Sequence, residues 1–344
     1  MNSKTCYGRF LSSLRSGEMR NPEHVMCLTF TPMTILITGC AGFIGSHLTE
    51  KLLNEGNRVL GMDNFQTGSK ANMQSFFDNK NFVFVEHDIE EPAHIGDEIN
   101  LIYHLACPAA PVHYQKNPIK TLNTAFIGTK NLLDLAHQKN TRILYVSTSE
   151  IYGDPLEHPQ HETYWGNVNP IGERSCYNEG KRAAEALSFA YHRQRNVDIR
   201  VVRIFNTYGP RMAKNDGRVV PNFVLQALAN EPITIYGTGD QTRSFCYVDD
   251  MVSGLVAMMN NGNNFTGPVN LGNPAEISMR SLAETVIYLT QSKSQLTFQP
   301  LPSDDPHRRK PDISLAQEKL GWEPSTNLKN GLKYTIDYFS QNVA

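Results

Sequence analysis

The sequence has little net charge, no long apolar run and no paired cysteines, features that mark several large classes of protein. Its formal net charge is only −2 over 344 residues, with no basic tract, so nucleic-acid binding has no electrostatic basis. No apolar run approaches the roughly 20 residues that a membrane-spanning helix needs. The six cysteines are scattered without a Cys-x-x-Cys pair, which is typical of free thiols in a reducing compartment. These absences favour a cytoplasmic protein with neither membrane nor nucleic acid as a partner.

Two further patterns are missing. Residues 1–32 lack both a clear apolar core and a small-residue cleavage site, so they make a poor signal peptide. We expect them to be either a flexible extension or the result of an upstream start, outside a fold that begins at Met33. The histidines and cysteines show no metal-ligand spacing, so no metal is indicated.

The most informative segment is TILITGCAGFIG at residues 34–45. A β-branched run predicts a buried strand over Met33–Thr38, and the following pattern predicts an amphipathic helix over Ile44–Glu55. Gly39, Gly42 and Gly45 fall in the turn between them. Glycine-rich turns also serve as simple helix caps, but such a turn before a helix N-terminus is typical of a pyrophosphate site.

The next strands support a dinucleotide as the ligand. A predicted strand over Arg58–Met62 ends in Asp63, about 20 residues beyond the glycines, where a carboxylate binds the adenosine ribose. Asn64 and Phe65 follow, with no arginine to accept a 2′-phosphate, so NAD is favoured over NADP. A third strand over Asn81–Glu86 leads to Asp88, either an adenine contact or part of an ordinary turn.

The rest of the chain continues the alternation of strands and helices that is typical of a doubly wound, Rossmann-type parallel sheet. Further strands are predicted over Leu101–Leu105, Arg142–Thr148 and Asp198–Phe205, and helices over Thr121–Gln138 and about Tyr177–Arg193. From Asn206 the elements become shorter and predict a smaller lobe at the carboxyl ends of the strands, with a helix over Val248–Met259 returning to the first lobe. We therefore expect an NAD-binding domain over 33–205 plus about 243–262, and a discontinuous substrate-binding lobe over 206–242 plus 263–344.

Tyr177 and Lys181 are the catalytic candidates, because residues at i and i+4 share one face of a helix. A phenol is a weak base at neutral pH, but a nearby ammonium together with a cationic nicotinamide lowers its pKa. One of the hydroxyls of Ser147, Thr148 and Ser149, at the end of the preceding strand, can hydrogen-bond the reacting oxygen. Taken alone, a Tyr-x-x-x-Lys pair is also common on protein surfaces, and a Ser/Thr run after a strand also caps helices.

Several motifs together resemble the extended short-chain dehydrogenase/reductase family, in its nucleotide-sugar-modifying members. They occur in the family's order: TGCAGFIG, Asp63, HLA at 104–106, STSEIYGD at 147–154, YNEGK at 177–181 and RIFNTYGPR at 203–211. Four segments are similar to the UDP-glucuronate decarboxylases of that family: 106–121, 152–182, 215–223 and 304–313.

The resemblance implies a reaction with tightly bound NAD, in which UDP-glucuronate loses its carboxylate through a 4-keto intermediate and yields UDP-xylose. Tyr177, Lys181 and Thr148 are then catalytic, and Glu150 lies near C5 of the sugar. Alignment through Lys310-Pro311 selects Arg309 over Arg308 as the cation beside the sugar carboxylate, where a planar guanidinium suits two oxygens. The alternative for this segment is a solvated run of charge.

The resemblance also carries over binding residues. Those for the cofactor are Gly39, Gly42, Phe43, Ile44, Gly45, Asp63, Asn64, Phe65, Thr67, Gly68, Asp88, Ile89, Leu105, Tyr177, Lys181, Thr207 and Arg211. Those for the nucleotide sugar are Tyr114, Lys120, Ser149, Glu150, Asn206, Val220, Asn222, Tyr236, Arg243 and Arg309. Members of the family dimerise through two helices per subunit, here 121–138 and 177–193.

Other functions stay open at this point. The same scaffold supports nucleotide-sugar 4-epimerases, which usually carry a small or apolar residue where Glu150 stands, and 4,6-dehydratases, which also carry a glutamate there. An inactive NAD-binding interaction protein is a further alternative, against which the intact Tyr177, Lys181 and Thr148 count. The last alternative is a metal or thiol enzyme of another class.

Overall fold

The computed structural model describes residues 32–262, 264–300 and 308–342, and the predictions for residues 1–31 lie outside this range. Its centre is a seven-stranded sheet in which every pair is parallel, in the order β11-β6-β5-β4-β1-β2-β3. This order confirms the predicted Rossmann-type fold. The strands are β1 (Thr34–Thr38), β2 (Arg58–Asp63), β3 (Phe82–Glu86), β4 (Leu101–His104), β5 (Arg142–Thr148), β6 (Ile199–Ile204) and β11 (Val269–Leu271).

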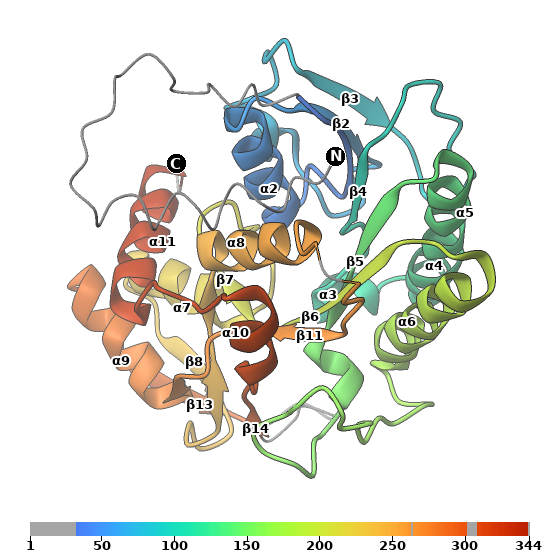
Figure 1. The fold of residues 1–344 in the computed structure, drawn as a ribbon. Helices are drawn as coiled ribbons and strands as arrows, with labels where there is room; N and C mark the ends of the chain where they lie inside the picture. Colours follow the sequence, from blue (N-terminus) through green and yellow to red (C-terminus); the bar gives the residue numbers. More distant parts are fainter. Residues whose placement is uncertain (1–31, 263, 301–307, 343–344) are drawn as a thin grey trace, which may run out of the picture. The chain divides into compact units, whose positions relative to one another are not determined.

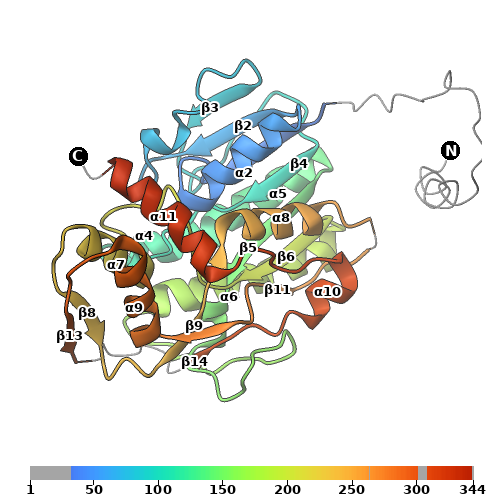
Figure 2. The ribbon, with the colours of Figure 1, turned by 90° about the vertical axis from the view of Figure 1, so that its left-hand side faces the viewer.

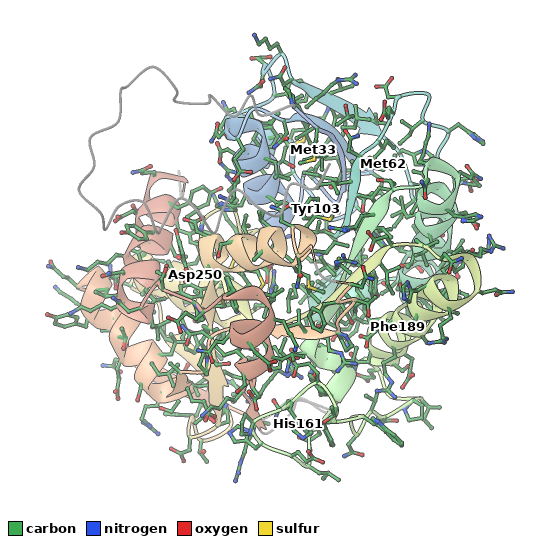
Figure 3. All side chains as sticks on the ribbon, in the orientation of Figure 1. Met33, Met62, Tyr103, His161, Phe189 and Asp250 are labelled. Carbon is green, nitrogen blue, oxygen red and sulfur yellow. The ribbon has the colours of Figure 1, made fainter. Side chains whose placement is uncertain are left out.

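Alternate residues of these strands enter two hydrophobic cores, one on each face of the sheet. Ile35 and Ile37 of β1 join the core beneath α2 (Phe43–Asn54) and α8 (Val248–Met259). Leu36, between them, joins the core beneath α5 (Thr129–Lys139) and α6 (Ser175–Arg195). Figure 1 shows α5 and α6 on one side of the sheet and α2 with α8 on the other. Met62 and Tyr103, labelled in Figure 3, enter opposite cores.

The remaining strands have two to four residues each. Three small sheets contain β7 (Thr207–Tyr208) with β10 (Cys246–Tyr247), β8 (Ile233–Tyr236) with β13 (Leu296–Gln299), and β9 (Thr242–Ser244) between β12 (Glu276–Ser278) and β14 (Arg308–Arg309). The helices around them, seen in Figure 2, are α7 (Val219–Leu228), α9 (Met279–Thr290), α10 (Ser314–Leu320) and α11 (Leu328–Asn342). Short helical turns are η3 (Lys70–Met73), α3 (Pro111–Tyr114) and η5 (Ser149–Tyr152).

The helix predicted over Thr121–Gln138 is not one regular helix. It begins earlier, as α4 (Pro118–Asn123), where Asn117 caps it by accepting from the Lys120 N–H at 3.2 Å and Pro118 takes the first position. A π-helical turn, η4 (Thr124–Gly128), then separates α4 from α5. A turn of five residues is too short to show a period of its own in the sequence, so periodicity alone does not reveal it.

The C-terminal segment also differs from the predicted domain boundaries. Residues 263–344 were expected to belong wholly to the smaller lobe, whereas β11 lies within them and pairs with β6 at the edge of the large sheet. A three-residue strand is too short to show a period in the sequence. Within the described residues, no helix is both long and apolar enough to cross a bilayer.

Candidate active site

A cavity of about 560 Å³ opens at the carboxyl ends of β1, β2, β4 and β5. Parallel sheets bind ligands at this edge. Fourteen of the residues predicted to bind the cofactor line it: Gly39, Gly42, Phe43, Ile44, Gly45, Asp63, Asn64, Thr67, Gly68, Ile89, Leu105, Tyr177, Lys181 and Arg211. Phe65, Asp88 and Thr207 are not among the lining residues, and Thr207 turns its hydroxyl back to the Phe205 carbonyl.

The glycine turn after β1 has the geometry that a phosphate site requires. Gly39 adopts the left-handed region, at φ +77°, and a Cβ on it would lie 3.0 Å from the Ala106 nitrogen. A Cβ on Gly45 would lie 2.0 Å from the Gly39 carbonyl oxygen. Helix α2 then begins with no side-chain cap and no acidic residue in its first turn. Its N–H groups therefore remain available to an anion, and the cavity fits a dinucleotide.

Asp63 lies at the end of β2, beside this turn. Its carboxylate accepts from the Ala41 N–H at 3.0 Å and the Phe65 N–H at 2.8 Å. Burial raises its pKa from the ordinary value, although these backbone hydrogen bonds act in the opposite direction. A Cβ on Gly68 would lie only 3.0 Å from Asp63 Oδ1, so the glycine keeps space open beside the carboxylate. This is the space that a ribose at Asp63 needs.

Arg211 brings a cation to the same cavity. Its backbone is in the left-handed region, at φ 67°, and its Nη2 donates to Glu50 Oε2 at 2.5 Å and to Ser75 Oγ at 3.2 Å. Its Nη1 is buried and has no hydrogen-bond partner among the described residues. An unpaired buried donor is costly, so it favours a ligand with acceptor oxygens at this point.

Tyr177 and Lys181 lie on the first turns of α6, as predicted, and both line the cavity. The Tyr177 hydroxyl is hydrogen-bonded to the side chain of Thr148, the last residue of β5. The Lys181 ammonium donates to the Val146 carbonyl at 2.9 Å and lies 4.9 Å from the centre of the Tyr145 ring. Strand β5 and helix α6 thus bring together Thr148, Tyr177 and Lys181, three of the residues predicted to be catalytic.

The protonation of Tyr177 and Lys181 depends on burial. Burial, followed by the neighbouring Cys107 thiol, raises the pKa of Tyr177 well above its ordinary value. Burial lowers the pKa of Lys181. In the chain without a cofactor, Tyr177 is therefore a proton donor rather than a base. A cation placed in the cavity reverses this tendency, because opposite charge favours the phenolate.

A second group of residues surrounds Glu150, in the η5 turn after Thr148. Arg309 Nη1 donates to Glu150 Oε1, and Arg174 Nη2 lies 3.4 Å from the same oxygen. Arg243 is the register partner of Arg309 in the parallel β9–β14 pair, so their side chains leave the same face of this sheet. Burial would raise the pKa of Glu150, but Arg309, Arg174 and Arg243 outweigh it and hold that pKa below its ordinary range.

Arg309 is buried, and most of its donors remain without a partner. Among the described residues, its Nε and Nη2 have no hydrogen-bond partner, whereas Nη1 is taken by Glu150. Arg308, next to it, is exposed. The free donors belong to the edge of a guanidinium that binds a carboxylate with two parallel hydrogen bonds. The site can therefore accept one more acid group at Arg309.

An aromatic stack joins the residues around Tyr177 to the residues around Glu150. The Tyr114 ring lies parallel to that of Tyr177, with centroids 5.1 Å apart and planes at 3°. Its hydroxyl accepts from Arg174 Nε at 2.9 Å. Arg174 was missed by sequence reasoning, although its place three residues before Tyr177 and adjoining the same helix was a usable signal. Arg218 and Asp216, a paired cation and anion in the cavity wall, were missed as well.

Other predicted substrate residues lie elsewhere in this structure. Lys120 pairs with Asp88 at 2.5 Å and Glu90 at 2.7 Å, so its predicted contact with a substrate carboxylate requires these pairs to open. Val220 packs in the hydrophobic core, and Tyr236 is half exposed on β8. For three others the structure shows contacts within the chain: Asn222 donates to the Gly217 carbonyl, the Asn206 carbonyl accepts from the Cys246 N–H, and Ser149 is buried beside Glu150. Contacts of these residues with a nucleotide sugar stay predictions.

His104 is buried, and both of its ring nitrogens are hydrogen-bonded to threonine hydroxyls. Its Nδ1 lies 2.9 Å from Thr38 Oγ1 and its Nε2 lies 2.9 Å from Thr129 Oγ1. Thr129 donates its own proton to the Ala125 carbonyl at 2.5 Å, so it accepts from Nε2–H, and Nδ1 must accept from Thr38. Burial lowers the pKa of His104 well below the ordinary value. The described residues contain no group of three His, Cys, Asp or Glu side chains that could hold a metal ion.

Comparison with known proteins defines the class to which this site belongs. Residues 36–335 match the family model described as GDP-mannose 4,6 dehydratase. The chain therefore belongs to this family of extended short-chain dehydrogenase/reductases, and the resemblance seen in its motifs is confirmed.

Two similar curated proteins within the family are both named UDP-glucuronic acid decarboxylase. The chain is 54% identical over 311 residues to UDP-glucuronic acid decarboxylase 1 of Arabidopsis thaliana, covering 90% of this chain and 71% of that one. It is 56% identical over 301 residues to UDP-glucuronic acid decarboxylase 3 of the same plant, covering 87% of each. A solved structure, the UDP-glucuronic acid 4-epimerase of Bacillus cereus with UDP-glucuronic acid and NAD, superposes with a TM-score of 0.80 and 30% identity over 90% of this chain and 100% of that one.

Proposed function

We propose that this chain decarboxylates UDP-glucuronate to UDP-xylose with a bound NAD that is regenerated in each cycle. The observation that carries the proposal is Arg309, a buried arginine with two free donors beside Glu150. The C5 carboxylate of a hexuronate would accept from both donors with two charged oxygens in one plane, whereas a hydroxyl of a neutral sugar offers a single uncharged oxygen. The names of the curated relatives support the same substrate and reaction.

The residues of the cavity fit NAD. The N–H groups at the start of α2 and the free Nη1 of Arg211 would hold the diphosphate, and Asp63 would bind the adenosine ribose. When bound, NAD supplies a hydride acceptor for C4 of the sugar and later returns the hydride. Lys181 would hold the nicotinamide ribose from the cavity wall.

Tyr177 would move the proton of the reaction. It would take the O4 proton of the sugar as C4 is oxidised, while the Thr148 hydroxyl orients that oxygen and holds the phenol. Ser149 would assist at O4. The pKa of the Tyr177 phenol, which burial raises, would be lowered by a positive charge bound beside it, and Tyr177 could then act as the base.

Arg309 and Glu150 would act on the acid group. Oxidation at C4 makes the substrate a β-keto acid, so the electrons of the breaking carbon–carbon bond flow into the new carbonyl as CO2 leaves. Arg309 would orient the carboxylate for this step, and Glu150 would lie near C5, where a proton must be added afterwards. Arg243, Asn206, Tyr114, Lys120, Val220, Asn222 and Tyr236 would contact the remainder of the UDP-sugar.

Product analysis tests the proposal. The purified chain is incubated with UDP-glucuronate and NAD, and the expected result is CO2 and UDP-xylose in equal amounts, with no net NADH. UDP-galacturonate as the product would instead identify a 4-epimerase, and no turnover of UDP-glucuronate would refute an enzyme of this group. Arg308→Ala is the matched control for Arg309→Ala, because Arg308 is its exposed neighbour.

We also propose that the chain forms a homodimer through α4–α5 and α6, the predicted helix pair. Four apolar side chains on α4 and η4 are exposed in the single chain: Ile119, Leu122, Phe126 and Ile127. Gly180 of α6 packs within the chain, where a Cβ on it would lie 3.0 Å from Ala125, so α6 and η4 lie close together. The exposed apolar face on α4 and η4 is suited to a helix from a second copy.

A further inference from the structure

A fully buried glutamine lies where two distant segments meet. Gln160 belongs to the loop between η5 and α6, next to His161, which Figure 3 labels at the lower end of the view. Neither the predicted site nor the mechanism above uses this residue. Fully buried glutamines are uncommon, and each polar atom of such a side chain needs a partner.

The partners of Gln160 lie mainly on the segment that follows Arg309. Its N–H donates to the Lys310 carbonyl at 2.9 Å, and its carbonyl accepts from the Asp312 N–H at 2.8 Å. Its side-chain Oε1 accepts from the Lys310 N–H at 2.9 Å, while Nε2 donates to the Glu157 carbonyl at 2.7 Å. Three hydrogen bonds thus hold the backbone directly after Arg309.

Asn270 of β11 extends this connection to the turn that carries Glu150. Its amide nitrogen donates to the Gln160 carbonyl at 3.0 Å and to the Asp312 carbonyl at 3.1 Å. Its amide oxygen accepts from the Tyr152 hydroxyl at 2.8 Å. Tyr152 is the last residue of η5, which contains Glu150. The two segments that form the Glu150–Arg309 pair are therefore joined a second time, behind the site.

Arg309 needs such support because its own element is small. Strand β14 has two residues and, among the described residues, pairs only with β9. A guanidinium binds a carboxylate with two hydrogen bonds only in a narrow range of orientations. A displacement of about 1 Å in a positioned group costs up to about a hundredfold in rate.

We propose that Gln160, together with Asn270, is a positioning residue that sets the preference of this site for an acidic sugar. It acts through Arg309 by fixing the backbone that follows the arginine, and it does not touch the substrate. The inference rests on the proposed function, in which Arg309 binds the sugar carboxylate. Gln160 therefore affects the carboxylate-dependent part of binding and leaves the binding of the uridine diphosphate unchanged.

The test compares affinities of the NAD-loaded enzyme for UDP-glucuronate and for UDP-glucose, which lacks the carboxylate. Gln160→Met keeps the side-chain volume and removes both polar atoms. We expect the ratio of the two affinities to fall about tenfold, which corresponds to about 1.4 kcal/mol, with unchanged affinity for UDP. Asn57→Leu is the control: Asn57 is equally buried and bonds Met33 and Leu52 at the opposite end of the sheet. It should destabilise the fold without changing the ratio.

A double variant identifies the route of the effect. If Gln160 acts through Arg309, Gln160→Met causes no further fall in the ratio when Arg309→Ala is already present. Should Gln160→Met fail to fold, Tyr152→Phe removes the hydroxyl that donates to Asn270 and accepts from Arg203 Nη1, and it should lower the ratio by a smaller factor. Arg203 also pairs with Glu185 and donates to the Glu162 carbonyl, contacts that this variant leaves in place. An unchanged ratio in the folded variants, or equal falls with and without Arg309, overturns the inference. A wild-type enzyme with no preference for UDP-glucuronate defeats the proposed function itself.

Discussion

Replacement of Arg309 by alanine is the sharpest perturbation that the structure offers. The change removes two free donors, Nε and Nη2, from a buried position beside Glu150. A hydrogen bond that involves a charged group contributes about 1.5–3 kcal/mol, so the two together contribute about 3–6 kcal/mol. If both form in the transition state, kcat/KM for UDP-glucuronate should fall by about 10²- to 10⁴-fold.

Two further variants are compared with Arg309→Ala. Arg309→Lys keeps the charge but loses the planar pair of donors, so its activity should lie between those of the wild type and Arg309→Ala. Arg308→Ala removes an exposed neighbour on the same two-residue strand, and its kcat/KM should stay within about twofold of the wild type.

The assay measures UDP-xylose by chromatography at several concentrations of UDP-glucuronate, with calorimetric titration of UDP alone. Removal of Arg309 also leaves the Glu150 carboxylate with one cation fewer, which should raise its pKa. The UDP titration shows whether this change disturbs the rest of the site. Arg309→Ala with kcat/KM within about tenfold of the wild type, or an equal loss of UDP affinity, would refute the reasoning.

Three further predictions test other parts of the molecule. Tyr177→Phe should bind NAD and UDP-glucuronate yet show no transient NADH absorbance, because nothing accepts the O4 proton; stopped-flow spectra that still show the transient would contradict this. Leu122→Arg should convert a dimer to a monomer in light scattering, since it places a charge on the exposed apolar face, and an unchanged mass would exclude this face. The folded pKa of His104 is lowered, so the unfolded chain binds its proton first and stability should fall as the pH drops below about 6.5. His104→Gln should flatten that part of the stability profile in denaturant titrations, and a profile of unchanged slope would show that another group is responsible.

The parts of the site built on long elements could be predicted from the sequence. Strand β5 matches its predicted range, and α6 extends the predicted helix at both ends, so Thr148, Tyr177 and Lys181 meet as expected. The glycine turn and Asp63 also lie together, because both follow adjacent parallel strands.

The contacts between distant short segments could not be predicted in the same way. Arg174 reaches Glu150 from the end of a long loop, and Lys120 turns to two carboxylates near β3 rather than toward the arginines. Side-chain partners of this kind depend on how loops fold back, which neither periodicity nor spacing encodes. The role of Arg309 came from family resemblance, and its free donors became visible only in three dimensions.

The edge position of β11 has a consequence for any attempt to divide the chain. The segment after α8 returns to complete the sheet beside β6, so a fragment that ends near residue 262 would leave a row of β6 backbone groups unpaired. It would also lose Asn270, the register partner of Arg203 in that strand pair. Open edges of this kind recruit other chains and lead to aggregation. The nucleotide-binding half is thus not a detachable module, and an engineered fusion or truncation should keep residues 264–342 with it.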